Sequence, residues 1–250
     1  MKYSIIYLVN DDIINTKLSL QRLIECSNGQ NAELFILVNS QKRYVIEYIS
    51  SIEKVNSLKI HKRFLETNLG VRARNLVINQ CAGEYIVLVD NDTVVFPGYL
   101  IKFERYINIS GIGCVSCFGW FLRVKDNAPD LVTDFRIHPG SFIDVASCSL
   151  ACYANLREKQ DFLLLPDDFD IYGFDDVYYS LLMKRYGLRV CYSGWDNFGI
   201  HLGSKIEKGE NLLRAYETNK QIIMRDFMDG GKLRRVKLEK QKEEMLCSKS

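Results

Sequence analysis

Two carboxylates spaced two residues apart follow a short apolar run in this chain. Residues 85–89 come after a glycine and are mostly aliphatic, which predicts a strand buried on both faces. Asp90 and Asp92 must then emerge at its carboxyl end, where open α/β sheets bind ligands. Such oxygens suit one Mn²⁺ or Mg²⁺ ion, whose shell is normally completed by substrate phosphates and water. The structural alternative is an acidic turn that closes a strand.

A second acidic pair begins a predicted helix. Asp175 and Asp176 lie in its first turn, apolar residues recur on one face, and Gly187 ends it. Because the helix dipole favours negative charge in a first turn, a purely structural explanation of this pair is complete in itself. A functional explanation depends on what the pair faces.

An arginine-bearing segment precedes the first acidic pair. The turn Asn68-Leu69-Gly70 is expected to open a helix that runs to Cys81, with Arg74 about one turn inside it. A helix start with an arginine beside a strand end could cradle an anion. The alternative is that Arg72 and Arg74 are solvated helix charges.

The elements that must position these residues alternate from the start of the chain. We predict strands at 3–9, 34–38 and 58–60, a first helix capped by Asn15 with Leu18 in its apolar stripe, and a second helix at 44–52. Because the strands do not alternate in polarity, they indicate parallel βαβ units of an α/β protein. Further elements are predicted at 99–106, 112–117, 142–153, 188–192 and 209–227.

The regular alternation lapses between residues 119 and 142. We therefore expect one domain at 1–205, in which 1–110 is a nucleotide-binding half and 111–205 an acceptor-binding half. Residues 206–250 would form a helical extension with a basic tail. That tail reads either as a solvated end or as a segment that docks on an anionic membrane.

Composition narrows the function classes. The 33 basic and 31 acidic residues nearly cancel, which gives no case for nucleic-acid binding. No apolar run approaches the roughly 20 residues of a membrane span, so we expect a cytoplasmic protein, with peripheral membrane contact as the alternative for its tail.

Cys114 and Cys117 have the spacing of half a zinc site. No second Cys/His pair follows at the spacing that a zinc site needs, which favours reduced structural thiols.

In this order the segments resemble the family 2 glycosyltransferases, which have the GT-A fold. The resemblance covers residues 3 to about 203. The motifs that carry it are the second strand ending near Asn39, Asn68-Leu69-Gly70 with Arg74-Asn75, Asp90-Asn91-Asp92, and Gly173-Phe174-Asp175-Asp176. It implies a mixed, mostly parallel central sheet flanked by helices. It also implies inverting, metal-dependent transfer of a sugar from a nucleotide-diphosphate donor, most commonly UDP-linked, to a glycan or lipid-linked saccharide in polysaccharide biosynthesis.

The resemblance also implies residue roles. Asp176 would be the general base and Asp175 would orient the acceptor. Asp92, Asp90 and His201 would hold the metal. The donor nucleotide would lie against Asn10, Asn39, Asn68, Gly70, Arg74, Asp90 and Asn91.

Three departures from the family pattern affect selectivity. Asn39 stands where many members have an acidic residue, Asn10 ends a first strand without the usual proline, and Asp175 replaces a glutamate. A nucleotidyltransferase would need a glycine-rich loop after the first strand, which this chain lacks. A non-catalytic sugar-nucleotide-binding module would not need both acidic pairs. Trp120, Trp195 and Tyr172 either offer a face for a sugar ring or belong to the core.

Overall fold

The structure is a computed structural model that describes residues 1–53, 55, 57–125, 128–132, 137–156, 162–195, 198–203, 210–229 and 232–233. The basic tail at 234–250 lies outside the described residues.

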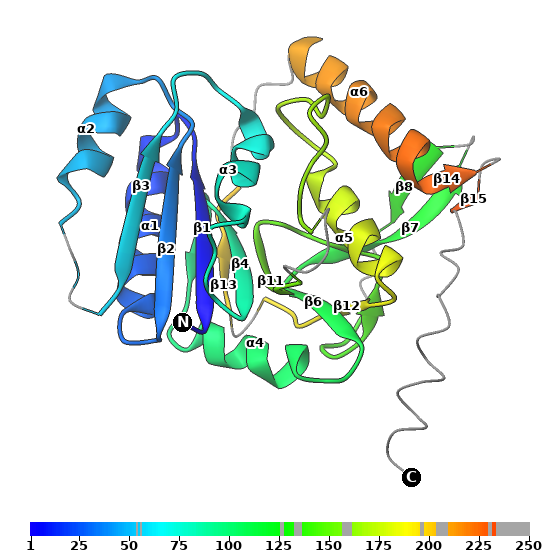
Figure 1. Cartoon of the computed structure of the whole chain (residues 1–250), viewed down its shortest axis with the longest axis horizontal. Helices are drawn as coiled ribbons and strands as arrows, with labels where there is room; N and C mark the ends of the chain where they lie inside the picture. Colours follow the sequence, from blue (N-terminus) through cyan, green and yellow to red (C-terminus); the bar gives the residue numbers. More distant parts are fainter. Residues whose placement is uncertain are drawn as a thin grey trace.

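One sheet of eight strands forms the centre of the molecule (Figure 1). Its order is β3 (Lys59–Phe64), β2 (Ala32–Val38), β1 (Tyr3–Val9), β4 (Tyr85–Asp90), β11 (Leu150–Ala154), β6 (Ile112–Ser116), β12 (Arg189–Tyr192) and β9 (Phe142–Ile143). All but β11 and β9 run in one direction. The prediction of a mixed, mostly parallel α/β sheet is therefore confirmed.

Three smaller sheets lie around the central one. β10 (Val145–Ala146), β7 (Gly119–Lys125) and β8 (Ala128–Val132) form the first. β5 (Thr93–Val95) pairs with β13 (Gly199–His201), and β14 (Met228–Asp229) pairs with β15 (Lys232–Leu233). The β5–β13 pair matters most for the site, because β5 begins directly after Asp92.

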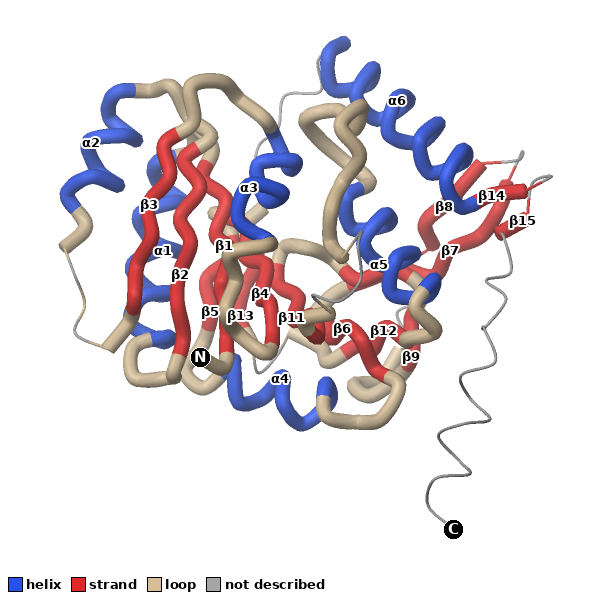
Figure 2. The backbone as a smooth tube through the Cα atoms, viewed as in Figure 1, coloured by secondary structure: helices blue, strands red, loops and turns tan. Residues whose placement is uncertain are grey.

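Helices cover both faces of the sheet (Figure 2). The core on one face packs α1 (Ile13–Ser27), α2 (Arg43–Ser51) and α4 (Tyr99–Ile107). The core on the other face packs α3 (Asn75–Ile78), α5 (Asp175–Arg185) and α6 (Glu210–Phe227). α6 was expected in a separate extension, yet its residues Ile222, Ile223 and Phe227 are buried in the same core as α5.

Local details differ from the sequence predictions at two helices. Asp12 caps α1 instead of Asn15, because its carboxylate accepts hydrogen bonds from both the backbone and the side-chain nitrogen of Asn15. Leu18 is 54% exposed and does not join the buried stripe. The helix expected up to Cys81 is a 3₁₀ turn, η1 (Gly70–Arg74), followed by α3, which already ends at Ile78.

The described cysteines are structural. All seven are buried and none of these seven forms a disulfide, and burial raises the pKa of the Cys114 thiol well above its ordinary value. In the part of the chain that the structure describes, no three His, Cys, Asp or Glu side chains form a ready metal cage.

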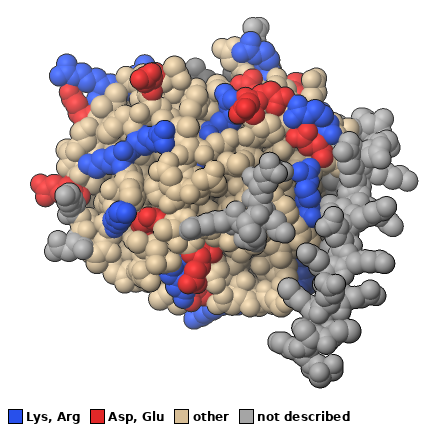
Figure 3. Space-filling model, viewed as in Figure 1, with Lys and Arg blue, Asp and Glu red and all other residues tan. Residues whose placement is uncertain are grey.

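The surface charges are mixed, as the near-equal numbers of basic and acidic residues lead one to expect. In the face shown in Figure 3, Lys and Arg are interspersed with Asp and Glu rather than gathered into one field. No described helix has the length and apolar character needed to cross a membrane.

Candidate functional site

The first acidic pair lies where β4 leaves the sheet. Residues 86–89 of β4 are fully buried, and the strand ends at Asp90. The backbone carbonyl of Asp92 accepts a 2.8 Å hydrogen bond from the Leu202 N–H, and the β5–β13 register places His201 opposite Thr93. His201 is therefore the last residue of β13. Strand pairing brings it to Asp92.

Asp92 and His201 present ligands that fit a divalent cation. Nε2 of His201 lies 3.3 Å from Oδ2 of Asp92, and this contact raises the pKa of His201. The residue is only 5% exposed, and its other carboxylate oxygen is buried without a hydrogen-bond partner among the described residues. A buried carboxylate oxygen normally finds a partner, so this one suits an ion. With two protein ligands, the remaining coordination positions of Mg²⁺ or Mn²⁺ are open to substrate phosphates and water.

Arg74 joins the two acidic pairs. Its side chain is 1% exposed, which makes the solvated-charge alternative wrong for this residue. Nη2 lies 2.7 Å from Oδ1 of Asp90, and Nη1 lies 2.5 Å from Oδ2 of Asp175. The end of β4 and the start of α5 thus meet at one guanidinium. Burial raises the pKa of Asp90 to about 6, and the charge of Arg74 opposes that rise.

Asp176 is left without a cationic partner among the described residues. One of its oxygens accepts a 2.9 Å hydrogen bond from the Val177 N–H. Burial, followed by the negative charge of Asp175, raises the pKa of Asp176 to about 8. A carboxylate that takes up a proton near neutral pH is equipped for proton transfer, and such perturbed groups concentrate at functional sites.

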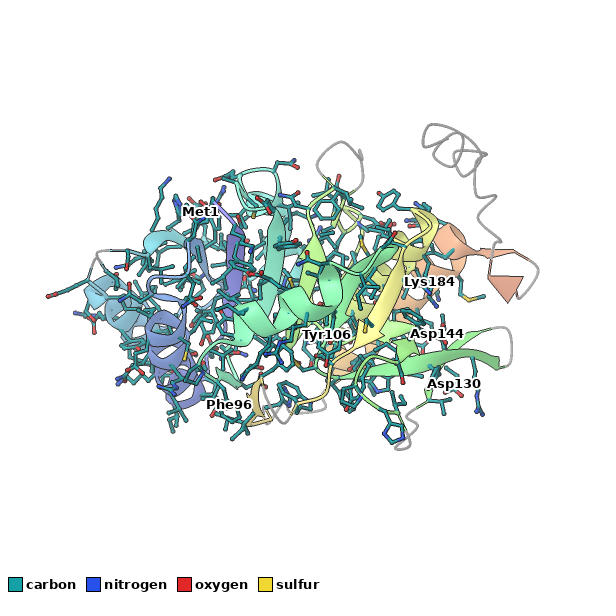
Figure 4. All side chains as sticks on the ribbon, turned by 90° about the horizontal axis from the view of Figure 1, so that it is seen from below. Met1, Phe96, Tyr106, Asp130, Asp144 and Lys184 are labelled. Carbon is teal, nitrogen blue, oxygen red and sulfur yellow. The ribbon has the colours of Figure 1, made fainter. Side chains whose placement is uncertain are left out.

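The far end of α5 is fixed to the strands of the second half. Lys184 in its last turn pairs with Asp144, which lies between β9 and β10 (Figure 4). Asp144 also accepts a hydrogen bond from the Leu122 N–H in β7. Together with the Arg74–Asp175 contact, this pair holds α5 at both ends.

Three residues predicted to bind the nucleotide meet at the turn 68–70, where Asn39 hydrogen-bonds to the backbone. Asn39 donates to the Gly70 carbonyl at 3.1 Å and accepts from the Leu69 N–H at 2.8 Å. Asn68 accepts from the Gly70 N–H at 2.8 Å. An acidic residue could not donate to the Gly70 carbonyl, which explains the amide at position 39. Gly70 has a φ of +56°, and a Cβ there would lie 1.7 Å from the Ile171 carbonyl oxygen.

Asn10 directly follows β1, and Asn91 directly follows β4. The Asn91 side chain is buried and donates to Oδ1 of Asn10 at 2.7 Å and to Oγ1 of Thr16 at 3.0 Å. The two asparagines therefore hold the loop after β4 against α1. Their predicted contact with the nucleotide stays a prediction.

Sequence reasoning missed the contribution of α6 to the site. Asn219 is fully buried between Ala215 and Ile222 and bonds to the loop that precedes the second acidic pair. A polar residue within the apolar stripe of an amphipathic helix was the available signal, since such a residue needs a specific partner.

A mostly parallel sheet with paired carboxylates at the end of β4 and at the start of α5 is the arrangement expected of a GT-A fold. The comparison with family models makes the assignment specific, because residues 9–135 match the model for Glycosyl transferase family 2. The chain belongs to this family. No curated protein matches it by sequence.

Solved structures share the fold. A mannosyltransferase from Pyrobaculum calidifontis, PcManGT, in complex with GDP-Man and Mn²⁺, has 15% identity and a TM-score of 0.59, over 82% of this chain and 57% of its own. S. aureus TarS 1-349 in complex with UDP-GlcNAc has 15% identity and a TM-score of 0.60, over 86% of this chain and 62% of its own. GalNAc-T7 with UDP, GalNAc and Mn²⁺ has 13% identity and a TM-score of 0.67, over 92% of this chain and 49% of its own. The chain thus spans less than two thirds of each of these proteins.

Proposed function

We propose that the chain is an inverting glycosyltransferase that moves a sugar from a nucleoside-diphosphate donor to a hydroxyl of a glycan or lipid-linked saccharide. UDP is the nucleoside diphosphate that we propose for the donor. The observation that carries the proposal is the meeting of both acidic pairs at Arg74, which leaves Asp92 and Asp176 free of that guanidinium. Family membership supports it, as do neighbours whose structures hold UDP- or GDP-linked sugars.

Asp92 and His201 would hold the divalent cation, Mn²⁺ or Mg²⁺. When bound, the ion supplies positive charge that offsets the charge of a departing diphosphate. Asp90 is held by Arg74, so we assign it to the donor ribose or to a water molecule of the ion's shell. Asn10, Asn91 and the turn at 68–70 would line the nucleotide.

Asp176 would remove the proton of the acceptor hydroxyl as that oxygen attacks the anomeric carbon. A base is most effective when its pKa lies near the working pH, and burial together with Asp175 brings Asp176 to about 8. Asp175, fixed by Arg74, would hold the start of α5 in place and orient the acceptor.

The cellular setting is proposed from the sequence alone. The transfer would be a step of polysaccharide biosynthesis that consumes nucleotide sugars in the cytoplasm, and the basic tail at 234–250 would bring the chain to an anionic membrane surface.

The test is metal-dependent cleavage of the donor. Purified protein is incubated with UDP- and GDP-linked sugars and Mn²⁺, and released nucleoside diphosphate is measured with and without EDTA. We expect release that EDTA abolishes and that Asp92→Asn lowers together with the Mn²⁺-dependent rise in melting temperature. Asp168→Asn, at an exposed pair with Arg225, is the matched control and should behave as wild type. Donor binding without release, also when glycan acceptors are added, would favour a non-catalytic module.

A further inference from the structure

Three aromatic side chains gather beside the second acidic pair. Tyr172 and Phe174 belong to the segment that leads into α5, and Tyr216 belongs to α6. The ring centroid of Tyr216 lies 5.9 Å from that of Tyr172 and 5.5 Å from that of Phe174. Tyr216 is 38% exposed, and the other two rings are partly buried. The cluster therefore contributes aromatic surface that a ligand could contact.

The cluster lies close to the proposed base. Phe174 directly precedes Asp175, at the N-terminal cap of α5. Burial raises the pKa of Tyr216, and the charges of Asp176 and Asp175 raise it further. The same two charges act on Tyr172, where burial is again the larger cause. Both phenols are therefore within electrostatic reach of the acidic pair.

The segment that carries two of these rings is rigidly held. The Asn219 amide donates to the carbonyls of Tyr172 at 3.0 Å and Gly173 at 2.9 Å, and it accepts from the Asp170 N–H at 2.6 Å. Gly173 has a φ of +85°, and a Cβ there would lie 3.1 Å from the Tyr216 ring. Phe174 is held at a φ of +62°, which a residue with a side chain rarely adopts.

The same segment contacts the turn that leads to Arg74. The Val71 N–H donates to the Ile171 carbonyl at 3.0 Å, next to Gly70. The aromatic cluster is thus fixed relative to both acidic pairs, and a surface fixed in this way loses little conformational entropy when a ligand binds.

We infer that Tyr172, Phe174 and Tyr216 form the surface that binds the sugar ring of the acceptor, so that α6 completes the acceptor site. A pyranose has an apolar face of C–H groups and a rim of hydroxyls, which matches an aromatic surface beside carboxylates. Asp90, Asp175 and Asp176 outnumber Arg74 here, so the site favours a neutral sugar over an anionic phosphate. This inference rests on the proposed function.

The other aromatic candidates from the sequence lie elsewhere. Trp120 packs edge to face against Phe118, with ring centroids 5.1 Å apart. Trp195 lies 6.1 Å from His201, beside the first acidic pair. Of the three residues named from the sequence, Tyr172 belongs to the cluster.

Saturation-transfer NMR tests the inference without knowledge of the natural acceptor. The probes are the methyl β-glycosides of glucose, galactose and N-acetylglucosamine, each at millimolar concentration with protein, UDP and Mn²⁺. For wild type we expect saturation of the ring C–H protons of at least one glycoside. Tyr216→Phe should retain the signal because it keeps the ring. Tyr216→Ala should weaken binding about 2- to 10-fold, the range for one aromatic contact.

Two further variants keep the result interpretable. Tyr216→Leu retains apolar packing against Gly173 but has no flat ring, so it should weaken binding as much as Tyr216→Ala does. Phe142→Ala removes a comparably exposed ring, 44% exposed on β9, and should leave binding unchanged. Metal-dependent donor cleavage is measured for every variant, and Phe142→Ala should keep it at the wild-type level.

Sugar binding that keeps the wild-type affinity in Tyr216→Ala and Tyr216→Leu would overturn the inference, and so would the absence of saturation transfer to every probe in wild type. Either result together with normal donor cleavage leaves the proposed function intact. Failure of the proposed function has a different signature, because wild type would then cleave no donor.

Discussion

The two acidic pairs of this protein have the same composition but different surroundings. Each gives one carboxylate to Arg74, Asp90 from the first pair and Asp175 from the second. Of the remaining two, Asp92 lies beside His201, whereas Asp176 has no cationic partner in the described part of the chain. One guanidinium therefore contacts two of the four carboxylates, offsets one negative charge, and leaves the other two carboxylates in distinct environments.

The local backbone makes the difference sharper. Asp92 follows a strand in irregular backbone, where an oxygen can point at an ion. Asp176 lies in the first turn of α5, where the helix dipole and the Val177 N–H favour the charged carboxylate. Its pKa nevertheless rises to about 8, so burial and the charge of Asp175 outweigh these effects. The comparison supports the proposal that one pair supplies an ion-holding carboxylate and the other a proton-accepting one.

The largest expected effect separates the two members of the second pair. Asp176→Asn should lower kcat by about 100- to 10,000-fold, the usual range for a general base, and leave the affinity for UDP unchanged. Asp175→Asn should lower kcat less, because it removes a partner of Arg74 and not the base. Steady-state kinetics and UDP titration measure both. Equal losses of kcat in the two variants would contradict the assignment of Asp176 as the base.

The next effect concerns the arginine that links the pairs. Arg74→Leu leaves two carboxylates without their cation and should lower the free energy of unfolding by about 3–5 kcal/mol, the range for breaking a buried ion pair. Urea unfolding measures the loss.

A second substitution sharpens this test. Asp175→Asn in the Arg74→Leu background should restore part of the stability, because one of the uncompensated charges is gone. Arg43→Leu, at a guanidinium whose side chain is 91% exposed, is the control and should cost less than about 1 kcal/mol. If Arg74→Leu cost no more than this control, Arg74 would not be the link between the pairs.

The smallest effect is a pH dependence. Asp176 must be deprotonated to act as a base, and its pKa is about 8. The value of kcat/KM should therefore rise about tenfold per pH unit below 8 and level off above it. Asp175→Asn should move the midpoint to lower pH, because it removes the negative charge that helps to raise this pKa. A profile that is flat between about pH 6 and 9 would rule out Asp176 as the titrating base.

Much of the framework followed from local sequence patterns. The buried run that became β4 and the apolar face of α5 are periodic signals, and they placed both acidic pairs at element ends. Other features escaped this reasoning. Asn39 differs from the family pattern because its amide serves the turn at Leu69 and Gly70, a contact between segments far apart in the chain.

The sequence by itself determined the alternation of strands and helices, and with it the positions of Asp92 and Asp176 at the ends of elements, because periodicity and turn chemistry are local properties. Only the tertiary structure decided what each charge faces. The β5–β13 pairing brings His201 to Asp92, and the packing of η1 against α5 buries Arg74 between two carboxylates. Burial and charge partners depend on residues that are distant in the chain, and these set the pKa values with which the site would work.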